Sequence, residues 1–252
     1  MKGPIPYVGG KSRFVSTILP MLPPHLTYVE PFSGGAQIFF QKQPSKVEVL
    51  NDLDGELVNF YRVCQSHHEE LIRYMRFLVV SREWFTRLQH TPPSSLTDIQ
   101  RAARYFYLQK NSFGGRVANQ SYARRVVISA SFSAARLAGQ IARAHERLDR
   151  VQVEQVPYEQ VIEKYDRPET FFYIDPPYYN VTGLYRFEFT HEQFEHLASQ
   201  LSQIKGRFLL SINDHPAIRA MFAAFQISTV SVPYTLQKHA GRKYQELLIK
   251  NY

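Results

Sequence analysis

Apolar residues along the chain follow two spacings, and each spacing predicts a different kind of element. Short apolar or alternating runs between turn-forming residues predict strands at 26–30, 47–50, 151–156, 170–174, 208–212, 227–232 and 244–251. Apolar residues three or four positions apart predict helices at 57–90, 96–108, 133–150, 158–165, 190–204 and 216–225. Shorter helical runs are expected through Phe14 and Ile18, and through Ile38 and Phe39.

The order of these elements predicts the fold class. Strands and helices alternate in the outer parts, 1–60 and 151–252, whereas the middle of the chain, 61–150, is almost entirely helical. Alternation of this kind is typical of a parallel α/β sheet with helices on its faces. We therefore predict one parallel sheet built from both outer parts and interrupted by a mostly helical insertion.

The net charge of +8 is confined to this predicted insertion. Residues 61–150 contain 15 Lys and Arg against 6 Asp and Glu, and the rest of the chain contains 15 against 16. Fourteen of those 15 basic residues are arginine, whose planar guanidinium suits phosphates and base edges. A solvated surface would usually mix lysine with glutamate. The insertion is therefore predicted to contact nucleic acid.

Several classes of protein are disfavoured by the same composition. No apolar stretch approaches the ~18 residues of a membrane span, and Met1-Lys2-Gly3-Pro4 lacks an apolar leader, so we expect a cytoplasmic protein. The single cysteine, Cys64, excludes an internal disulfide and a thiolate metal cluster. His67 and His68 are adjacent and point apart on a helix. We expect a monomer that binds neither a membrane nor a metal.

Residues 170–180 end a buried strand in a rigid polar platform. Pro176 and Pro177 cannot donate hydrogen bonds to a strand ladder, and Pro176 also holds Asp175 extended. The platform carries the Asp175 carboxylate, a carbonyl freed from pairing and the ring of Tyr178. Two acceptors beside a flat ring suit a planar heterocycle with an exocyclic amine. An ordinary strand that ends in an Asp-Pro turn is the alternative.

Two glycine turns precede this platform. Gly9 and Gly10 come before Lys11, which can hold a carboxylate or phosphate at a helix start, although the spacing is not that of a phosphate-binding loop. The strand at 26–30 leads into Pro31-Phe32-Ser33-Gly34-Gly35-Ala36, and Asp52 lies 18 residues after Gly34, where an acid can meet a ribose diol. This pattern fits dinucleotides and S-adenosylmethionine alike, but the third glycine of the dinucleotide fingerprint is missing.

A polar loop punctuated by glycines lies inside the basic insertion, at 110–125. Arginine, asparagine and glutamine side chains can make paired hydrogen bonds to guanine or adenine edges. A flexible hairpin with a solvated surface is the alternative. Given the charge distribution, we expect DNA contacts from Asn111, Arg116, Asn119, Gln120, Arg124 and Arg125.

Taken together, the motifs resemble the Dam-type, alpha-group N6-adenine DNA methyltransferases over nearly the whole chain. The matching segments are Pro-Tyr-Val-Gly-Gly-Lys at 6–11, Glu-Pro-Phe-Ser-Gly-Gly at 30–35, Asn-Asp-Leu-Asp at 51–54, Asp-Pro-Pro-Tyr at 175–178, Leu-Ser-Ile-Asn-Asp at 210–214 and Glu-Leu-Leu-Ile-Lys-Asn-Tyr at 246–252. Each segment alone is common. Their order, around a basic insertion, is specific.

The resemblance implies a Rossmann-like class I methyltransferase sheet, with 1–60 and 151–252 as the S-adenosylmethionine-binding catalytic domain and 61–150 as the DNA target-recognition domain. It implies a site-specific enzyme that methylates N6 of an adenine flipped out of double-stranded DNA. Such an enzyme would be bacterial or phage-encoded, nucleoid-associated, and part of restriction–modification or regulation.

By the same resemblance, Tyr7 stacks on the adenine of S-adenosylmethionine, Lys11 meets its methionine end and Asp52 holds its ribose. Glu30, Pro31, Phe32 and Asp175 would line the cofactor cleft, and the catalytic residues would be Asp175, Pro176, Pro177 and Tyr178.

Three positions depart from the family pattern. Tyr7 stands where tryptophan is common, and Ala36 stands where a glycine is common. The acid that often reads the cofactor's adenine amine is missing near Val156-Pro157-Tyr158. Three other functions stay open on the sequence alone: cytosine-N4 methylation, which uses the same acceptor pair; DNA binding with a vestigial cleft; and nicotinamide-dependent oxidoreduction.

Overall fold

The computed structural model describes residues 1–12, 14–123, 133–233 and 243–252. Within these ranges seven strands form one sheet, in the order β3-β2-β1-β4-β5-β7-β6. Strands β1 to β5 run parallel, and β7 is antiparallel to both of its neighbours. The predicted α/β class is confirmed. The strands are β1 Thr27–Glu30, β2 Val47–Asn51, β3 Gln152–Glu154, β4 Thr170–Ile174, β5 Arg207–Asn213, β6 Gln226–Pro233 and β7 Lys243–Lys250.

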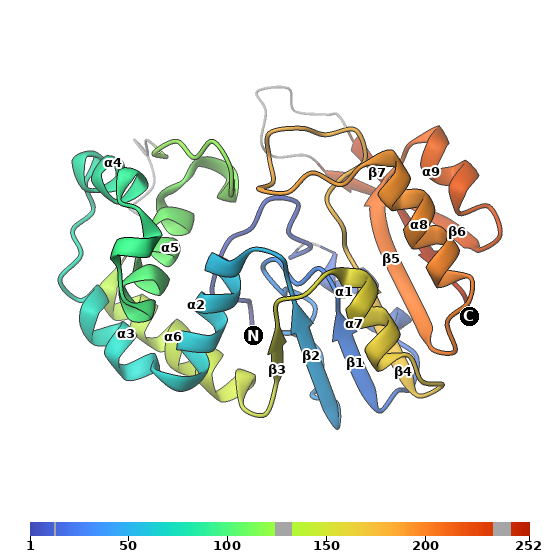
Figure 1. Ribbon diagram of the computed structural model, residues 1–252, viewed down its shortest axis with the longest axis horizontal. Helices are drawn as coiled ribbons and strands as arrows, with labels where there is room; N and C mark the ends of the chain where they lie inside the picture. Colours follow the sequence, from blue (N-terminus) through green and yellow to red (C-terminus); the bar gives the residue numbers. More distant parts are fainter. Residues whose placement is uncertain (13, 124–132, 234–242) are drawn as a thin grey trace.

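Helices lie on both sides of the sheet and gather beyond its β3 end (Figure 1). Helices α7, α8 and α9 lie along the sheet, whereas α3, α4, α5 and α6 are grouped beyond β3. The helices are α1 Val15–Ile18, α2 Gly55–Ser66, α3 His68–Met75, α4 Arg82–His90, α5 Asp98–Asn111, α6 Ala134–Leu148, α7 Tyr158–Tyr165, α8 His191–Leu201 and α9 Pro216–Met221.

The alternation of side chains along the strands divides the core in two. Tyr28 of β1 and Tyr173 of β4 belong to the same core cluster as residues of α2, α3, α5 and α6, whereas Val29 and Ile174 belong to a second cluster with residues of α7, α8 and α9. Successive residues of a strand point to opposite faces, so a strand buried on both sides is apolar throughout. The continuous apolar runs at 170–174 and 208–212 follow from this burial.

Helix α2 joins the sheet to the helical group. It begins after Asp54, whose Oδ1 accepts the Glu56 amide at 3.1 Å, and it runs to Ser66. The boundary predicted between residues 60 and 61 therefore lies inside one helix. Tyr61 is fully buried, and its hydroxyl donates to the Gly34 carbonyl at 2.7 Å. The division into two domains stays a prediction, but the helix ties both parts together.

The helix predicted through Ile38 and Phe39 does not form, so that prediction was wrong. Residues 33–42 fold as successive turns, with Ala36 donating to Ser33 at 2.7 Å. Ala36 adopts φ +46°, a left-handed conformation that interrupts a right-handed helix. The Phe39 amide donates to the Glu30 carboxylate at 3.0 Å rather than to a helical carbonyl. Ala36 thus holds the conformation that glycine adopts more easily.

In the described part of the chain, none of the helices is both long and apolar enough to cross a membrane.

Candidate active site

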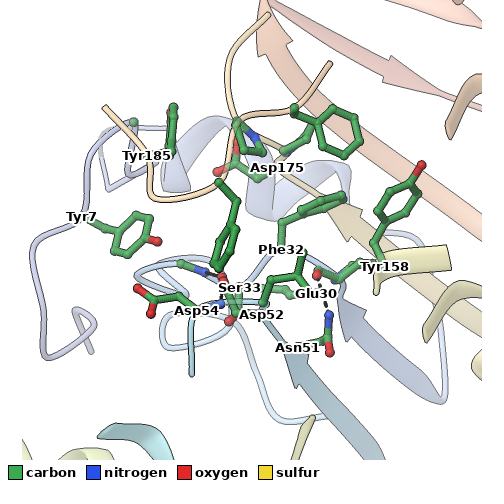
Figure 2. A pocket seen from close by; sticks show the side chains of 18 of the residues that line it. Tyr7, Glu30, Phe32, Ser33, Asn51, Asp52, Asp54, Tyr158, Asp175 and Tyr185 are labelled. Atoms are coloured by element: carbon green, nitrogen blue, oxygen red, sulfur yellow. Dashed lines mark hydrogen bonds between the residues drawn. The ribbon is translucent and has the colours of Figure 1, made fainter. Parts of the chain in front are cut away.

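A cavity of about 300 Å³ opens where the carboxyl ends of β1, β2 and β4 meet. Chain connections diverge between β1 and β4, and such a switch point is where α/β sheets bind ligands. Every residue that the sequence assigned to the cofactor lines this cavity, including Tyr7, Lys11, Asp52 and Asp175. Figure 2 shows Tyr7, Asp52 and Asp175 converging on the cavity from separate strand ends and loops.

Asp175 follows the last residue of β4, and its two carboxylate oxygens differ. Oδ1 accepts from Lys11 Nζ at 2.7 Å and from Ser211 Oγ at 3.2 Å. Among the described residues no donor reaches Oδ2 or the Pro176 carbonyl. Burial raises the pKa of Asp175 to about 6; Lys11 opposes that rise and Glu246 adds to it. One oxygen is fixed, and two neighbouring acceptors stay open to a donor.

Lys11 lies between two acids, Asp175 and Glu246. Its ammonium lies 2.7 Å from Asp175 and 2.8 Å from Glu246, and it also donates to the Tyr178 hydroxyl and the Gly9 carbonyl, each at 3.2 Å. Burial alone would lower the pKa of Lys11, but the two acids and Tyr178 raise it well above its usual value. Lys11 therefore stays charged, and a cofactor carboxylate would have to exchange with one of these partners.

Tyr178 is held from its hydroxyl end. The hydroxyl donates to Glu246 Oε2 at 3.2 Å, and the Lys11 ammonium lies 4.7 Å from the ring centroid. Tyr178 does not line the cavity, unlike Pro176 and Pro177. Its predicted stacking on a target base stays a prediction, and such a base would lie beside the cofactor cavity rather than inside it.

Two acids stand at the end of β2. Asp52 accepts the amides of Gly34 and Asp54, each at 2.9 Å, and burial raises its pKa to about 6. Gly34 adopts φ +44°, which lets the turn approach the carboxylate. Asp54 is 2% exposed and forms an ion pair with Arg186 at 2.8 Å. The sequence singled out Asp52 but neither Asp54 nor Arg186, which come together only through the fold.

Aromatic rings enclose one end of the cavity. The ring centroids of Phe32 and Tyr158 are 5.1 Å apart, and Phe189 lies 5.5 Å from Phe32 and 5.4 Å from Tyr158. Figure 2 shows Tyr7 on the opposite side of the cavity from Phe32 and Tyr158. A planar ligand therefore has two possible ring platforms. Two acids that the sequence did not single out, Glu159 and Glu188, also line the cavity.

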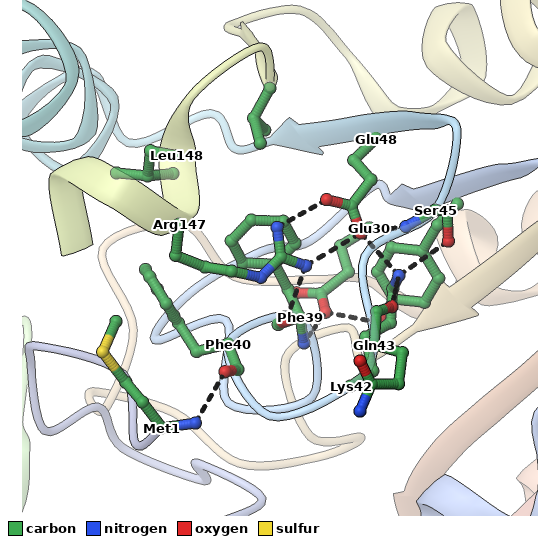
Figure 3. Close-up of polar contacts among 12 residues, drawn as sticks. Met1, Glu30, Phe39, Phe40, Lys42, Gln43, Ser45, Glu48, Arg147 and Leu148 are labelled. Carbon is green, nitrogen blue, oxygen red and sulfur yellow. Dashed lines mark hydrogen bonds and ion pairs between the residues drawn. The ribbon is translucent and has the colours of Figure 1, made fainter. Parts of the chain in front are cut away.

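The cavity floor is braced by a buried polar network (Figure 3). Glu30 is 1% exposed and accepts from the Tyr28 hydroxyl at 2.6 Å and the Phe39 amide at 3.0 Å; burial raises its pKa to about 8. Arg147 of α6 donates to the Phe39 carbonyl at 3.0 Å and stacks on that ring at 3.7 Å. Glu48 of β2 then pairs with Arg147 at 2.8 Å.

The residues predicted to contact DNA lie in different surroundings. Asn111 is 5% exposed and donates to the Tyr107 carbonyl at 2.9 Å, so DNA contact would require this buried side chain to move. Asn119 is exposed, with φ +49°, and Arg116 and Gln120 are half-buried. Arg124 and Arg125 lie outside the described residues. The loop after β4 touches this segment, because Ala118 donates to the Leu184 carbonyl at 3.5 Å.

Residues 7–236 match the D12 class N6 adenine-specific DNA methyltransferase family. The chain belongs to this family. It is 24% identical to the type II methyltransferase M.CviBI of Paramecium bursaria Chlorella virus NC1A, over all of both chains. It is 25% identical to the type II methyltransferase M1.LlaDCHI of Lactococcus lactis subsp. cremoris, over 98% of this chain and 94% of the relative. It is 24% identical to the DNA adenine methylase of Escherichia coli (strain K12), over 96% and 92%.

The predicted family and activity are therefore confirmed: the protein is an adenine-specific DNA methyltransferase. Cytosine-N4 methylation and nicotinamide chemistry, which the sequence left open, are not the activities of this family. Sequence reasoning did not single out Ser211, Asp54, Arg186 or Glu246, which contact residues of the site or line its cavity. Glu246 gave one signal, a carboxylate inside a strand of apolar residues, although nothing local named its partner.

Proposed function

We propose that the methyltransferase binds S-adenosyl-L-methionine in the cavity at the ends of β1, β2 and β4 and methylates N6 of an adenine flipped out of double-stranded DNA. The observation that supports this most is the open acceptor pair: Asp175 Oδ2 and the Pro176 carbonyl, at the cavity wall, without a donor among the described residues. An exocyclic amine carries two N–H donors, one for each acceptor.

The other cavity walls suit the remaining parts of the cofactor. Asp52, fixed by two backbone amides, offers a carboxylate to the ribose hydroxyls. The ring platforms of Tyr7 and of Phe32 with Tyr158 would both suit the adenine, and the Phe32 end of the cavity offers three rings, those of Phe32, Tyr158 and Phe189. Lys11, which also lines the cavity, would hold the methionine end. Bound here, the cofactor supplies an electrophilic methyl group on a sulfonium.

Asp175 and Pro176 make the target amine a better nucleophile. The lone pair of adenine N6 is delocalised into the ring, so the free amine is a poor nucleophile. Acceptors placed on both N–H groups favour a pyramidal nitrogen whose lone pair points out of the ring plane. An ionised Asp175 also stabilises the positive charge that develops on N6 and can accept the proton that leaves. Positioning is then the main remaining task, because no covalent enzyme intermediate is required.

An adenine inside a duplex cannot reach these acceptors, so the base must be extruded. The arginine-rich insertion supplies phosphate and groove contacts, with Arg116, Asn119 and Gln120 as the candidates among the described residues. Tyr178 offers a ring beside the extruded base. The loop after Tyr178 touches both the insertion, through Leu184, and the cofactor cavity, through Arg186. This loop is thus placed to close on DNA and cofactor together.

The direct test is transfer of tritium from methyl-labelled S-adenosylmethionine to duplex DNA. We expect label in the DNA only when both substrates are present. Calorimetry with S-adenosylhomocysteine provides a second readout, because Asp52→Asn should weaken binding about tenfold through the loss of a charged ribose acceptor. Absence of transfer by a folded protein that still binds DNA would contradict the proposal and favour a vestigial cleft.

The pH dependence of transfer follows from Asp175. The carboxylate accepts the amine only when ionised, and its pKa is about 6. We therefore expect kcat/KM for DNA, at saturating cofactor, to rise between about pH 5 and 7 and then to level off. Asp52 has a similar pKa, so saturating cofactor is needed to remove its influence on binding. A flat profile over this range would show that Asp175 is not the titrating acceptor.

A further inference from the structure

Glu246 is a buried acid that does not line the cofactor cavity. It lies on the antiparallel strand β7, opposite Asn213 of β5, and is 5% exposed. Its Oε1 lies 2.8 Å from Lys11 Nζ, and its Oε2 accepts from the Tyr178 hydroxyl at 3.2 Å. A charged group is rarely buried without a partner. Glu246 has two partners, and both of them belong to the proposed active site.

The cluster contains more negative than positive charge. Lys11 contributes one ammonium, whereas Asp175 and Glu246 contribute two carboxylates, so the buried triad has a formal charge of −1 when all three are ionised. If Lys11 paired with Asp175 alone, the ammonium would stabilise the carboxylate anion more strongly, and Asp175 would then be a weaker hydrogen-bond acceptor. Glu246 also pairs with the Lys11 ammonium and adds a negative charge of its own. Asp175 is therefore a stronger hydrogen-bond acceptor than it would be beside Lys11 alone.

The remaining groups around Asp175 affect its charge less than Lys11 and Glu246 do. Its Oδ1 also accepts from Ser211, which in turn contacts the Tyr173 hydroxyl at 3.1 Å. The titratable groups that face Asp175 are Lys11, Glu30, Tyr173, Tyr178, Tyr185 and Glu246. The tyrosines stay protonated, because burial raises the pKa of each of them. Glu246 is thus the neighbouring acid that touches the same lysine as Asp175.

We propose that Glu246 is a positioning residue for methyl transfer: it divides the charge of Lys11 between two carboxylates, keeps Asp175 basic enough to accept the target amine, and orients Tyr178 through its hydroxyl. This inference rests on the proposed role of Asp175. It assigns no contact between Glu246 and either substrate. Glu246 acts through Lys11 and Tyr178 only.

The test compares Glu246→Gln with the wild-type methyltransferase in steady-state transfer across pH. Glutamine keeps the size of the side chain but removes its charge, so Lys11 acts on Asp175 alone and the pKa of Asp175 falls. We expect kcat at pH 8 to fall about tenfold, whereas KM for cofactor and DNA changes less than about threefold. The acidic limb of the pH profile, the range over which kcat/KM for DNA rises, should move about one pH unit lower. Glu246→Asp, which keeps the charge, should leave the limb near its wild-type position.

The matched control is Glu195→Gln on α8, the same change on a side chain that is 61% exposed; it should alter neither kcat nor the limb. A Glu246→Gln enzyme with the wild-type limb would overturn the proposal, even if its kcat were lower, because a merely structural role reduces activity without moving the limb. If Glu246→Gln does not fold, the Glu246→Asp limb decides: a displaced limb overturns the proposal. Failure of the proposed function looks different, since wild type would then transfer no methyl group or Asp175→Asn would stay active.

Discussion

Replacing Asp175 by asparagine lowers kcat for methyl transfer by about a thousandfold or more, while DNA affinity stays within about threefold of wild type. Asparagine has nearly the same size, so packing around the side chain is little disturbed, although the ion pair with Lys11 becomes at most a neutral hydrogen bond. Its amide, however, has no negative charge to stabilise a developing positive charge on N6. It also cannot accept the departing proton. Asp175→Ala, which removes both acceptor oxygens, should abolish transfer.

The measurement is single-turnover transfer from labelled cofactor, beside DNA binding by fluorescence anisotropy at several salt concentrations. A salt slope equal to that of wild type would show that the variant makes the same number of phosphate contacts. The matched control is Asp214→Asn, an acid after β5 whose ion pair with Arg219 lies outside the cavity; it should keep wild-type transfer. Full activity of Asp175→Asn would remove Asp175 from the catalytic role.

Replacing Glu48 by leucine should lower the free energy of unfolding by about 3–5 kcal/mol. The Glu48 carboxylate is the shared partner of Lys42 and Arg147, whose side chains are only 3% and 14% exposed. Without it, two buried cations lose their counter-ion, and neither can turn easily toward water. Arg147 also holds the Phe39 carbonyl in the turn below the cofactor cavity (Figure 3). The same variant should therefore bind S-adenosylhomocysteine more weakly.

Equilibrium unfolding in urea measures this loss. Glu154→Leu on the neighbouring strand β3 is the control, because Glu154 and its partner Lys164 are more exposed than the Glu48 cluster, at 23% and 58%. Exposed pairs contribute about 0–1 kcal/mol, so the control should lose far less stability than Glu48→Leu. If both variants lost the same free energy of unfolding, the buried network around Glu48 would stabilise the protein no more than the exposed pair does.

The sequence was sufficient wherever neighbouring residues decide the structure. The apolar run at 170–174 followed by Asp175 and two prolines predicted both the buried strand β4 and the acceptor at its end. Parallel strands end at one edge of a sheet, so the acids after β2 and β4 could be expected to meet there. The family resemblance drawn from these motifs is confirmed by the match over residues 7–236.

Long-range partners and local backbone strain could not be predicted in the same way. Lys11 and Glu246 lie at opposite ends of the chain, and their ion pair depends on β7 entering the sheet beside β5. Arg186 reaches Asp54 only because the loop after β4 turns back over the cavity. The helix expected after Gly35 fails because Ala36 takes a positive φ, and the spacing of apolar residues contains no signal for that.

The most direct measurement is the identity of the methylated nucleoside in DNA exposed to the enzyme. The chain is expressed in a host that lacks DNA methyltransferases, and its genomic DNA is digested to nucleosides and quantified by mass spectrometry. We predict N6-methyladenine in cells with the wild-type chain and none with Asp175→Asn. N4-methylcytosine in its place, or N6-methyladenine at equal levels with Asp175→Asn, would contradict the central claim.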